Sequence, residues 1–201
     1  MNIAIEKLNG QHVYLEKLIP EHSSILRQLA KDDRIWEFNK TFSTGPLFDT
    51  QFDDYIRIAL DTAAMGGQQA FIVRQKPTGT VIGMTRFYQI HPNDKRVAIG
   101  YTWYTPSVWG RVHNKECKLL LLTYALEVLG YCRVEFHIAH QNIRSQKAVA
   151  KIGAVKEGEL RKYGFRNDGS VRNTVVFSII DDEWPVVKEN LLRMITANEN
   201  Q

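Results

Sequence analysis

The apolar positions in the first third of the chain follow strand spacing once and helix spacing twice. The run from Val13 to Leu18 predicts a strand. Pro20 then opens a helix, in which the apolar residues recur at spacings of three and one: Ile25, Leu26 and Leu29. A second helix is predicted over residues 50–65 from Phe52, Tyr55, Ile56, Ala59 and Leu60. The pair Gly66-Gly67 ends this helix.

The middle of the chain has the pattern of antiparallel strands. Two apolar runs at 70–74 and 80–87 flank the turn sequence Lys76-Pro77-Thr78-Gly79, which predicts a hairpin. A second turn at His91-Pro92-Asn93-Asp94 precedes an apolar and aromatic strand at 97–104. We therefore expect an antiparallel meander in this part of the sheet.

A helix and a further strand follow. The helix predicted over 114–129 is apolar around much of its circumference, so we expect it to pack closely against the sheet. The strand at 133–139 alternates Val134, Phe136 and Ile138 with Arg133, Glu135 and His137. A crossover of this length normally joins parallel neighbours. The strands at 97–104 and 133–139 are therefore predicted to be parallel.

The last part of the chain predicts a short helix, a hairpin and a final helix. Asn142 is a natural N-cap for the short helix, and Gly153 closes it. The hairpin turns at Asn167-Asp168-Gly169-Ser170. Together the elements predict the α+β class, with a mixed, mostly antiparallel sheet and helices on both faces. We expect one domain over residues 1–201.

Composition narrows the function classes. The chain has 201 residues, 44% hydrophobic and 24% charged, which is typical of a globular domain. The formal net charge is +4, from 26 Lys and Arg against 22 Asp and Glu. No run of basic residues concentrates this charge, so a nucleic-acid partner is not expected.

The cysteines and histidines indicate neither a disulfide framework nor a metal site. Cys117 and Cys132 form no CxxC motif, which favours a reduced, cytoplasmic setting. His137 and His140 are the only close pair of histidines, and residues three apart on a strand point to opposite faces. Residues 1–10 contain no apolar leader segment, and no apolar run approaches the roughly 18 residues that span a bilayer.

The segment from Pro106 to Lys118 combines a basic loop with a helix start. The first backbone N–H groups of a helix have no partner within it and carry a partial positive charge, which suits an anion. Arg111 and Lys115 add positive side chains there, with Lys118 one turn further on. We interpret the segment as a pyrophosphate cradle for a nucleotide-bearing cofactor.

Three motifs, in this order of elements, resemble the GNAT superfamily of acyl-CoA-dependent N-acyltransferases. They are Ile99-Gly100-Tyr101-Thr102-Trp103-Tyr104, His113-Asn114-Lys115-Glu116-Cys117-Lys118-Leu119-Leu120-Leu121, and Asn142-Ile143-Arg144-Ser145 with Ile152-Gly153-Ala154. The chain looks most like the branch that includes the ribosomal-protein alanine acetyltransferases. The resemblance covers residues 12–188.

The resemblance implies that acetyl-CoA binds where the strands at 97–104 and 133–139 splay apart. It also implies direct attack on the thioester by a primary amine, either a protein amino terminus or a small molecule. The cofactor-binding residues that it implies are Thr102, Trp103, Tyr104, Trp109, Gly110, Arg111, Val112, His113, Asn114, Lys115 and Asn142. A monomer or homodimer without a membrane partner is expected.

Departures from the family pattern shape the catalytic hypothesis. Val149 stands where the family often places the Tyr that protonates the thiolate, and Ser145, one turn earlier, is the alternative that the branch implies. Capping of the helix is the other role open to Ser145. Ala98 stands where relatives often have an acid. Glu135, with His137 on the same strand face, is then the candidate base, although both residues also suit an ordinary polar surface.

Two further features leave alternatives open. Val112 replaces the second glycine of the family's cofactor loop, which leaves the backbone path of the loop undetermined. Trp36, Glu37 and Phe38 lie where the family borders its acceptor site, while Trp36 and Phe38 equally suit a core. A non-catalytic CoA-binding or regulatory module is the alternative function. The identity of the amine acceptor is open.

Overall fold

The computed structural model describes residues 5–36, 47–165 and 169–199. Within them the chain forms one eight-stranded sheet in the order β1-β2-β3-β4-β5-β6-β8-β7. The strands are β1 (Lys7–Asn9), β2 (Val13–Lys17), β3 (Gln68–Gln75), β4 (Thr80–His91), β5 (Arg96–Tyr104), β6 (Arg133–Ala139), β7 (Val155–Phe165) and β8 (Val171–Ile180). The helices are α1 (Ser23–Ala30), α2 (Phe48–Ala64), α3 (His113–Thr123), α4 (Ile143–Lys151) and α5 (Trp184–Glu199). Glu37, Phe38 and the predicted turn at Asn167-Asp168 lie outside the described residues.

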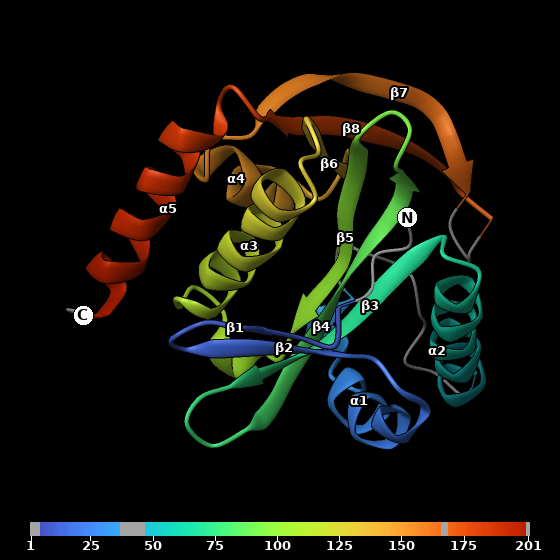
Figure 1. The fold of residues 1–201 in the computed structure, drawn as a ribbon. Helices are drawn as coiled ribbons and strands as arrows, with labels where there is room; N and C mark the ends of the chain where they lie inside the picture. The colour runs from blue at the N-terminus through green and yellow to red at the C-terminus, as the bar shows by residue number, and fades with distance from the viewer. Residues whose placement is uncertain (1–4, 37–46, 166–168, 200–201) are drawn as a thin grey trace.

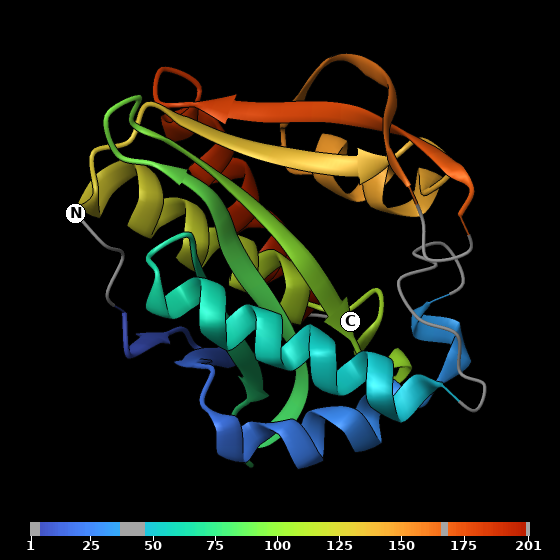
Figure 2. The same cartoon turned by 90° about the vertical axis from the view of Figure 1, so that its right-hand side faces the viewer.

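Helices cover both faces of the sheet, as the sequence predicts. Figures 1 and 2 show α1 and α2 on one face and α3, α4 and α5 on the other. Each face has its own hydrophobic core. Leu26, Phe52 and Met84 belong to the core beneath α1 and α2, and Leu121 and Leu191 belong to the core beneath α3 and α5. Among the described helices, none has the length and apolarity needed to cross a membrane.

The predicted antiparallel meander is confirmed over β3 to β5, and it contains a bulge. Pairing passes from Met84 with Trp103 to Arg86 with Gly100, so β5 carries one extra residue. Tyr101 occupies the bulge with a positive φ of 51°, a strained conformation for a residue with a side chain. The Arg86 guanidinium lies 4.5 Å from the centroid of the Tyr101 ring and 4.1 Å from that of Tyr55. This stacking holds the bulge against α2.

The parallel pairing of β5 and β6 is confirmed and is short. It contains Arg96 with Arg133, Val97 with Val134 and Ala98 with Glu135, and it ends there. β6 continues to pair with β8 as far as Ala139. The two strands therefore separate after their first three pairs, and Figure 2 shows them diverging. The predicted splay is present.

Some elements differ from the sequence prediction. The helix predicted over 114–129 begins at His113 and changes at Tyr124–Val128 into a π-helical turn, which leucine spacing does not distinguish. The strand β1 has three residues, too few to show alternation. His140 follows the end of β6, so the strand argument that separated it from His137 does not apply to it.

Glu116 ties α3 to the turn between β1 and β2. Its buried carboxylate accepts hydrogen bonds from the backbone N–H groups of Gln11, His12 and Val13 at 2.7, 2.8 and 2.7 Å. A Cβ at Gly10 would lie 2.6 Å from the carboxyl carbon of Glu116, so the turn needs glycine for this close approach. The contact fixes the start of α3 relative to the sheet.

We expect Glu116→Gln to destabilise the fold by about 2 kcal/mol, because hydrogen bonds to a charged group each contribute about 1.5–3 kcal/mol and the amide loses one acceptor. Urea denaturation followed by circular dichroism measures the change. Glu189→Gln, at an exposed position on α5, is the matched control and should stay within about 0.5 kcal/mol of wild type. Equal midpoints for Glu116→Gln and wild type would contradict the prediction.

Candidate active site

The loop after β5 leads directly into the amino terminus of α3. Its short 3-10 turn, Pro106–Val108, is followed by Gly110 with a φ of +76°. A Cβ at Gly110 would meet nothing within 4 Å, so the backbone conformation, rather than space, calls for glycine. The N-cap residue Val112 makes no side-chain cap hydrogen bond, and its carbonyl accepts the first helical bond from Glu116 at 3.0 Å. The helix start thus has donors to offer an external anion.

Positive charge gathers at this helix start. Burial lowers the pKa of Lys115, and the charge of Lys151 on α4 lowers it further. Burial also lowers the pKa of His113, with additional contributions from His12 and Arg111. Each of these pKa values falls partly because like charges are close together. A bound anion would relieve that repulsion.

Two buried polar atoms at the start of α3 fit a polar ligand. Nδ1 of His113 and Oδ1 of Asn114 have no hydrogen-bond partner among the described residues. Buried polar atoms in folded proteins nearly always have a partner. A pyrophosphate with its attached amide-containing arm supplies both acceptors and donors, so the residues at this site fit such a group.

The region beyond Ala98 and Glu135, where β5 and β6 no longer pair, is here called the opening. The loop and α4 meet across it. Nε1 of Trp109 donates a hydrogen bond to the Tyr104 carbonyl oxygen at 2.9 Å. The Arg144 guanidinium, at the start of α4, lies 4.3 Å from the centroid of the Trp109 ring. This cation–π contact joins the two segments that border the opening.

The predicted residues on β5 do not all face the opening. The Trp103 side chain is buried in the core under α2, with its ring centroid 5.7 Å from that of Trp36. Trp36 is therefore a core residue, one of the two roles that its position suggested. The Tyr104 side chain is buried in the core under α3. Only the backbone of Trp103 and Tyr104 is left for a cofactor.

Thr102 and Lys118 meet on the α3 side of the opening. Oγ1 of Thr102 lies 2.8 Å from Oγ1 of Thr85, and Nζ of Lys118 donates to Oγ1 of Thr102 at 3.2 Å. Nζ of Lys118 also lies 5.5 Å from the centroid of the Phe136 ring on β6. Burial lowers the pKa of Lys118 to about 8.

Sequence reasoning counted Lys118 only as a positive charge one turn past the cradle and did not predict that it lies between β5 and β6, although a signal exists. Lys118 shares a helix face with Leu121, Leu122 and Ala125, at spacings of three, four and seven, and those three residues are fully buried. A lysine on the apolar face of a helix must be buried with its charge or reach an opening. Here it reaches the gap between β5 and β6.

The start of α4 has the geometry that the sequence predicts. Oδ1 of Asn142 accepts a hydrogen bond from the Ser145 backbone N–H at 3.0 Å, which confirms Asn142 as the N-cap. Ser145 is half-buried in the first turn. Val149, one turn later, is buried in the core under α3 and α4. Val149 has no group that could donate a proton.

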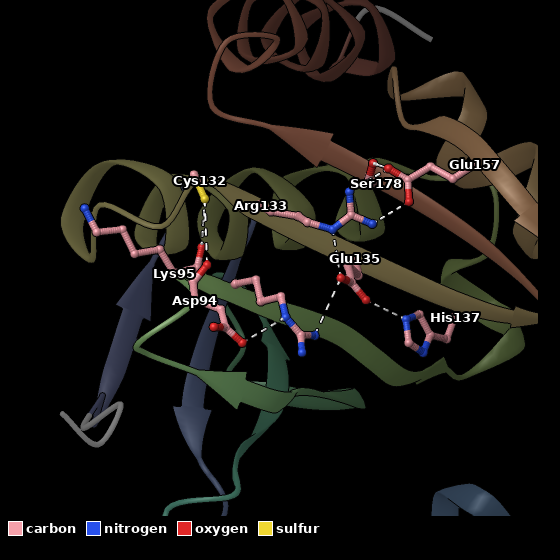
Figure 3. A network of polar contacts seen from close by, with 9 residues as sticks. Asp94, Lys95, Cys132, Arg133, Glu135, His137, Glu157 and Ser178 are labelled. Carbon is pink, nitrogen blue, oxygen red and sulfur yellow. Dashed lines mark hydrogen bonds and ion pairs between the residues drawn. The ribbon is translucent and has the colours of Figure 1, made fainter.

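On the opposite face of β6, Glu135 is held in a network of ion pairs (Figure 3). Its carboxylate accepts from Nε of Arg133 at 2.8 Å and lies 2.7 Å from Nε2 of His137. A guanidinium nitrogen of Arg96 lies 3.7 Å away. Burial alone would raise the pKa of Glu135, but the hydrogen bonds from Arg133 and His137 outweigh it and lower the pKa. Glu135 is therefore a fixed anion beside the His137 ring.

His137 faces an aromatic group on the α2 side of the sheet. Its ring is edge-on to the rings of Tyr88 and Tyr163, with both centroid distances at 6.1 Å. Tyr88 in turn contacts Tyr101 of the β5 bulge at 5.2 Å. The bulge and the Glu135–His137 pair thus lie around the same part of the opening.

A family model described as an acetyltransferase (GNAT) domain matches residues 12–155, most of the chain. The chain belongs to the GNAT acetyltransferase family. A curated N-acetyltransferase of Bacillus subtilis (strain 168), YoaA, which is described as uncharacterized, is 29% identical over 108 residues, or 54% of this chain and 60% of that protein. The match thus spans less than two thirds of that relative.

Solved structures agree with this family. A GCN5-related N-acetyltransferase from Brucella melitensis has a TM-score of 0.86 and 26% identity, with 97% of this chain and 87% of that chain covered. A spermidine N-acetyltransferase from Vibrio cholerae, solved with CoA and spermine, has a TM-score of 0.70 and 16% identity, with 88% and 99% covered. The latter likeness concerns the fold alone.

In this GNAT fold the predicted site residues divide between the two faces of the sheet. Thr102, Asn142, Ser145 and the loop at 109–115 lie on the side of α3 and α4. Glu135 lies on the side of α2, because it alternates along β6 with Phe136, which belongs to the core under α3. The structure therefore brings these cofactor candidates together, leaves the Trp103 side chain in the core under α2, and places the candidate base across the sheet from them.

The network around Arg133 predicts a loss of stability in acid. The hydrogen bond from Arg133 lowers the pKa of Glu157 to about 2, and the Ser178 hydroxyl contributes to this shift. Because the pKa of Glu157 is lower in the folded state than in the unfolded state, the ionised carboxylate stabilises the fold at pH values above about 4.5. This contribution is lost as the pH falls from about 4.5 toward 2. Unfolding free energies measured by urea titration across this range should fall less steeply for Glu157→Gln than for wild type.

Glu159→Gln is the matched control for this measurement. Glu159 is an exposed carboxylate two residues along β7 and accepts a hydrogen bond from the Asn173 side chain rather than from an arginine. In Glu159→Gln the unfolding free energy should depend on pH as it does in the wild-type protein. If the unfolding free energy of Glu157→Gln depended on pH as steeply as that of the wild-type protein, a stabilising role for the Arg133–Glu157 pair would be refuted.

Proposed function

We propose that this chain is an acetyl-CoA-dependent N-acetyltransferase, with residues 1–201 forming a single acetyltransferase domain. The observation that carries the proposal is the end of β5–β6 pairing at Ala98 and Glu135, next to the start of α3, whose first backbone N–H groups suit an anion. Beyond that point the facing edges of β5 and β6 are not paired with each other, so an extended arm could pair with them, and the helix start suits its pyrophosphate. Two proteins that share this fold were solved with such ligands: RimJ of Mycobacterium smegmatis with CoA-disulfide, and the Vibrio cholerae spermidine N-acetyltransferase with CoA and spermine.

The proposed cofactor contacts come from β5, the loop and α4. Backbone groups of residues 102–104 would pair with the pantetheine arm, much as an added strand would. Residues 109–115 would hold the pyrophosphate through backbone N–H groups, Arg111 and Lys115. A charged group near a helix start contributes about 0.3–1 kcal/mol, so several donors together matter more than any one of them. Asn142 both caps α4 and borders the arm.

The cosubstrate supplies an acetyl thioester, and the protein must manage the protons of the reaction. The attacking amine must be neutral, and it loses a proton as the amide forms. His137 would accept that proton, and the Glu135 carboxylate at 2.7 Å would stabilise the charge on the ring. Backbone N–H groups near the β5 bulge would stabilise the oxyanion, where one donor is typically worth about 2.7–4 kcal/mol.

The alternative function is a non-catalytic CoA-binding or regulatory module. It is favoured by two buried apolar residues, Ala98 and Val149, at positions where relatives often have ionisable side chains. The Glu135–His137 pair favours catalysis, because a structural role requires no histidine beside a fixed carboxylate. The two functions differ in whether thiol is released.

The deciding experiment is release of CoA thiol from acetyl-CoA in the presence of amines. The panel contains peptides with free amino termini, polyamines and amino acids, and mass spectrometry identifies the acetylated product. Acceptor-dependent thiol release is the expected result. CoA binding by calorimetry without release for any amine would favour the regulatory module. Absence of CoA binding would refute both functions.

Ser145 is the residue on α4 that we expect to assist the leaving sulfur by a hydrogen bond. Ser145→Ala should lower kcat by roughly tenfold, at or below the low end of the 10²–10⁴-fold range typical of proton-transfer groups, since a serine hydroxyl is a weak acid. The KM for acetyl-CoA should stay near wild type, the pattern of an interaction made in the transition state. Steady-state kinetics on the folded variant measures both. A wild-type kcat, with chemistry rate-limiting, would leave capping as the only role of Ser145.

A further inference from the structure

Lys118 carries a buried charge that the fold does not pair. The residue is 6% exposed, and among the described residues no carboxylate forms an ion pair with Nζ. Its partners are the Thr102 hydroxyl and the Phe136 ring. Lysines are almost never buried unless paired, because removing the ammonium from water is costly. An unpaired buried lysine at this place indicates a role beyond stability.

The Nζ atom of Lys118 lies where β5 and β6 have already separated. Thr102 is four residues beyond Ala98, the last residue of β5 that pairs with β6. Phe136 is one residue beyond Glu135, the last residue of β6 that pairs with β5. Nζ contacts both residues, so it reaches into the gap from the α3 side. The same gap is where the thioester of the proposed cosubstrate would lie.

Among the residues that the structure describes, the surroundings of Nζ contain no other acid that could neutralise it. On α3, the Cys117 thiol is buried and burial raises its pKa, and the Glu116 carboxylate is turned to the β1–β2 turn. On β5, burial raises the pKa of the Tyr104 phenol. β4 presents the Thr85 hydroxyl. On this face β6 presents the apolar residues Val134, Phe136 and Ile138, and Glu135 and His137 lie on the opposite face.

We propose that the Lys118 ammonium donates the proton that converts the departing CoA thiolate into the thiol, a role that rests on the proposed acetyltransferase function. The amine nitrogen forms its bond to the acetyl carbon, the carbon–sulfur bond breaks, and sulfur takes the bonding electron pair. One Nζ proton then passes to sulfur. The lysine, left neutral, regains a proton from solvent, and the proton lost by the amine leaves on the other face through His137.

In this proposal the two proton transfers take place on opposite faces of the sheet. The amine proton leaves on the α2 side, where Glu135 holds His137, and the sulfur is protonated on the α3 side, where Lys118 lies. Val149 offers no donor from α4, and Ser145 offers only a weakly acidic hydroxyl. Because burial lowers the pKa of Lys118 to about 8, the ammonium is a stronger acid than an exposed lysine and is close to a cysteine-like thiol of pKa about 8.5.

The first test needs only the wild-type protein and CoA. The ultraviolet absorbance of the CoA thiolate is followed as a function of pH, free and bound to the protein. A nearby ammonium stabilises the thiolate, so bound CoA should ionise at a lower pH than free CoA. Bound CoA that ionises at the same pH as free CoA, or higher, would overturn the proposal whatever any variant does.

The second test compares Lys118→Met with Lys156→Met, a control at an exposed position on β7. Lys118→Met should return the ionisation of bound CoA toward that of free CoA and lower kcat roughly a hundredfold, within the range of proton-transfer groups. The KM for acetyl-CoA should change little. Lys156→Met should match wild type in both measurements. Wild-type kcat and CoA ionisation in folded Lys118→Met would refute the proposal.

The pH profile separates Lys118 from Ser145. An acid must be protonated to act, so wild-type kcat should fall above a pH of about 8 as Lys118 loses its proton. Ser145→Ala should keep that alkaline fall, and Lys118→Met should lose it. A wild-type protein that binds no CoA and releases no thiol would refute the proposed function itself. Thiol release with CoA ionisation unaffected by Lys118 would refute only this inference.

Discussion

The short pairing between β5 and β6 is the constraint on which the candidate site depends. After Ala98 and Glu135 the two strands no longer share hydrogen bonds, because β6 follows β8 while β5 follows β4 and bulges at Tyr101. A strand edge inside a sheet exposes backbone donors and acceptors that must find partners. A ligand with amide groups along an extended arm can meet that need. The opening therefore forms because β5 stays paired with β4 and β6 stays paired with β8 as the two strands diverge.

Charges are buried on each side of this opening, and each is handled differently. Arg86 is stacked between Tyr55 and Tyr101 and holds the bulge. Glu135 is compensated by Arg133 and His137. Lys118 alone among these three has a hydroxyl and an aromatic ring as partners. In our proposals Arg86 is part of the framework, Glu135 supports His137, and Lys118 is positioned for a charge that forms during the reaction.

Much of the fold was predictable because the residues that form it are local. The β6 strand at 133–139 was predicted with the bounds that the structure has, since alternation of Val134, Phe136 and Ile138 with polar residues is unambiguous. The Asn142 cap was predictable from a side chain that bonds three residues ahead. The π-helical turn at Tyr124–Val128 was not, because the same leucine spacing fits either helix. The Tyr101 bulge was hidden because a register shift involves two strands.

Most of the elements and the basic loop before α3 could be predicted from the sequence, because capping, turn chemistry and periodicity act over a few residues, and three motifs carried the resemblance to the family. Which side chains share the opening depends on the tertiary structure. In the tertiary structure the Trp103 and Tyr104 side chains pack into the cores on opposite faces of the sheet. Glu135 contacts both Arg133 and His137, and Lys118 donates a hydrogen bond to Thr102. These contacts join residues on different elements. Their geometry depends on strand register and helix packing, which no local pattern of residues encodes.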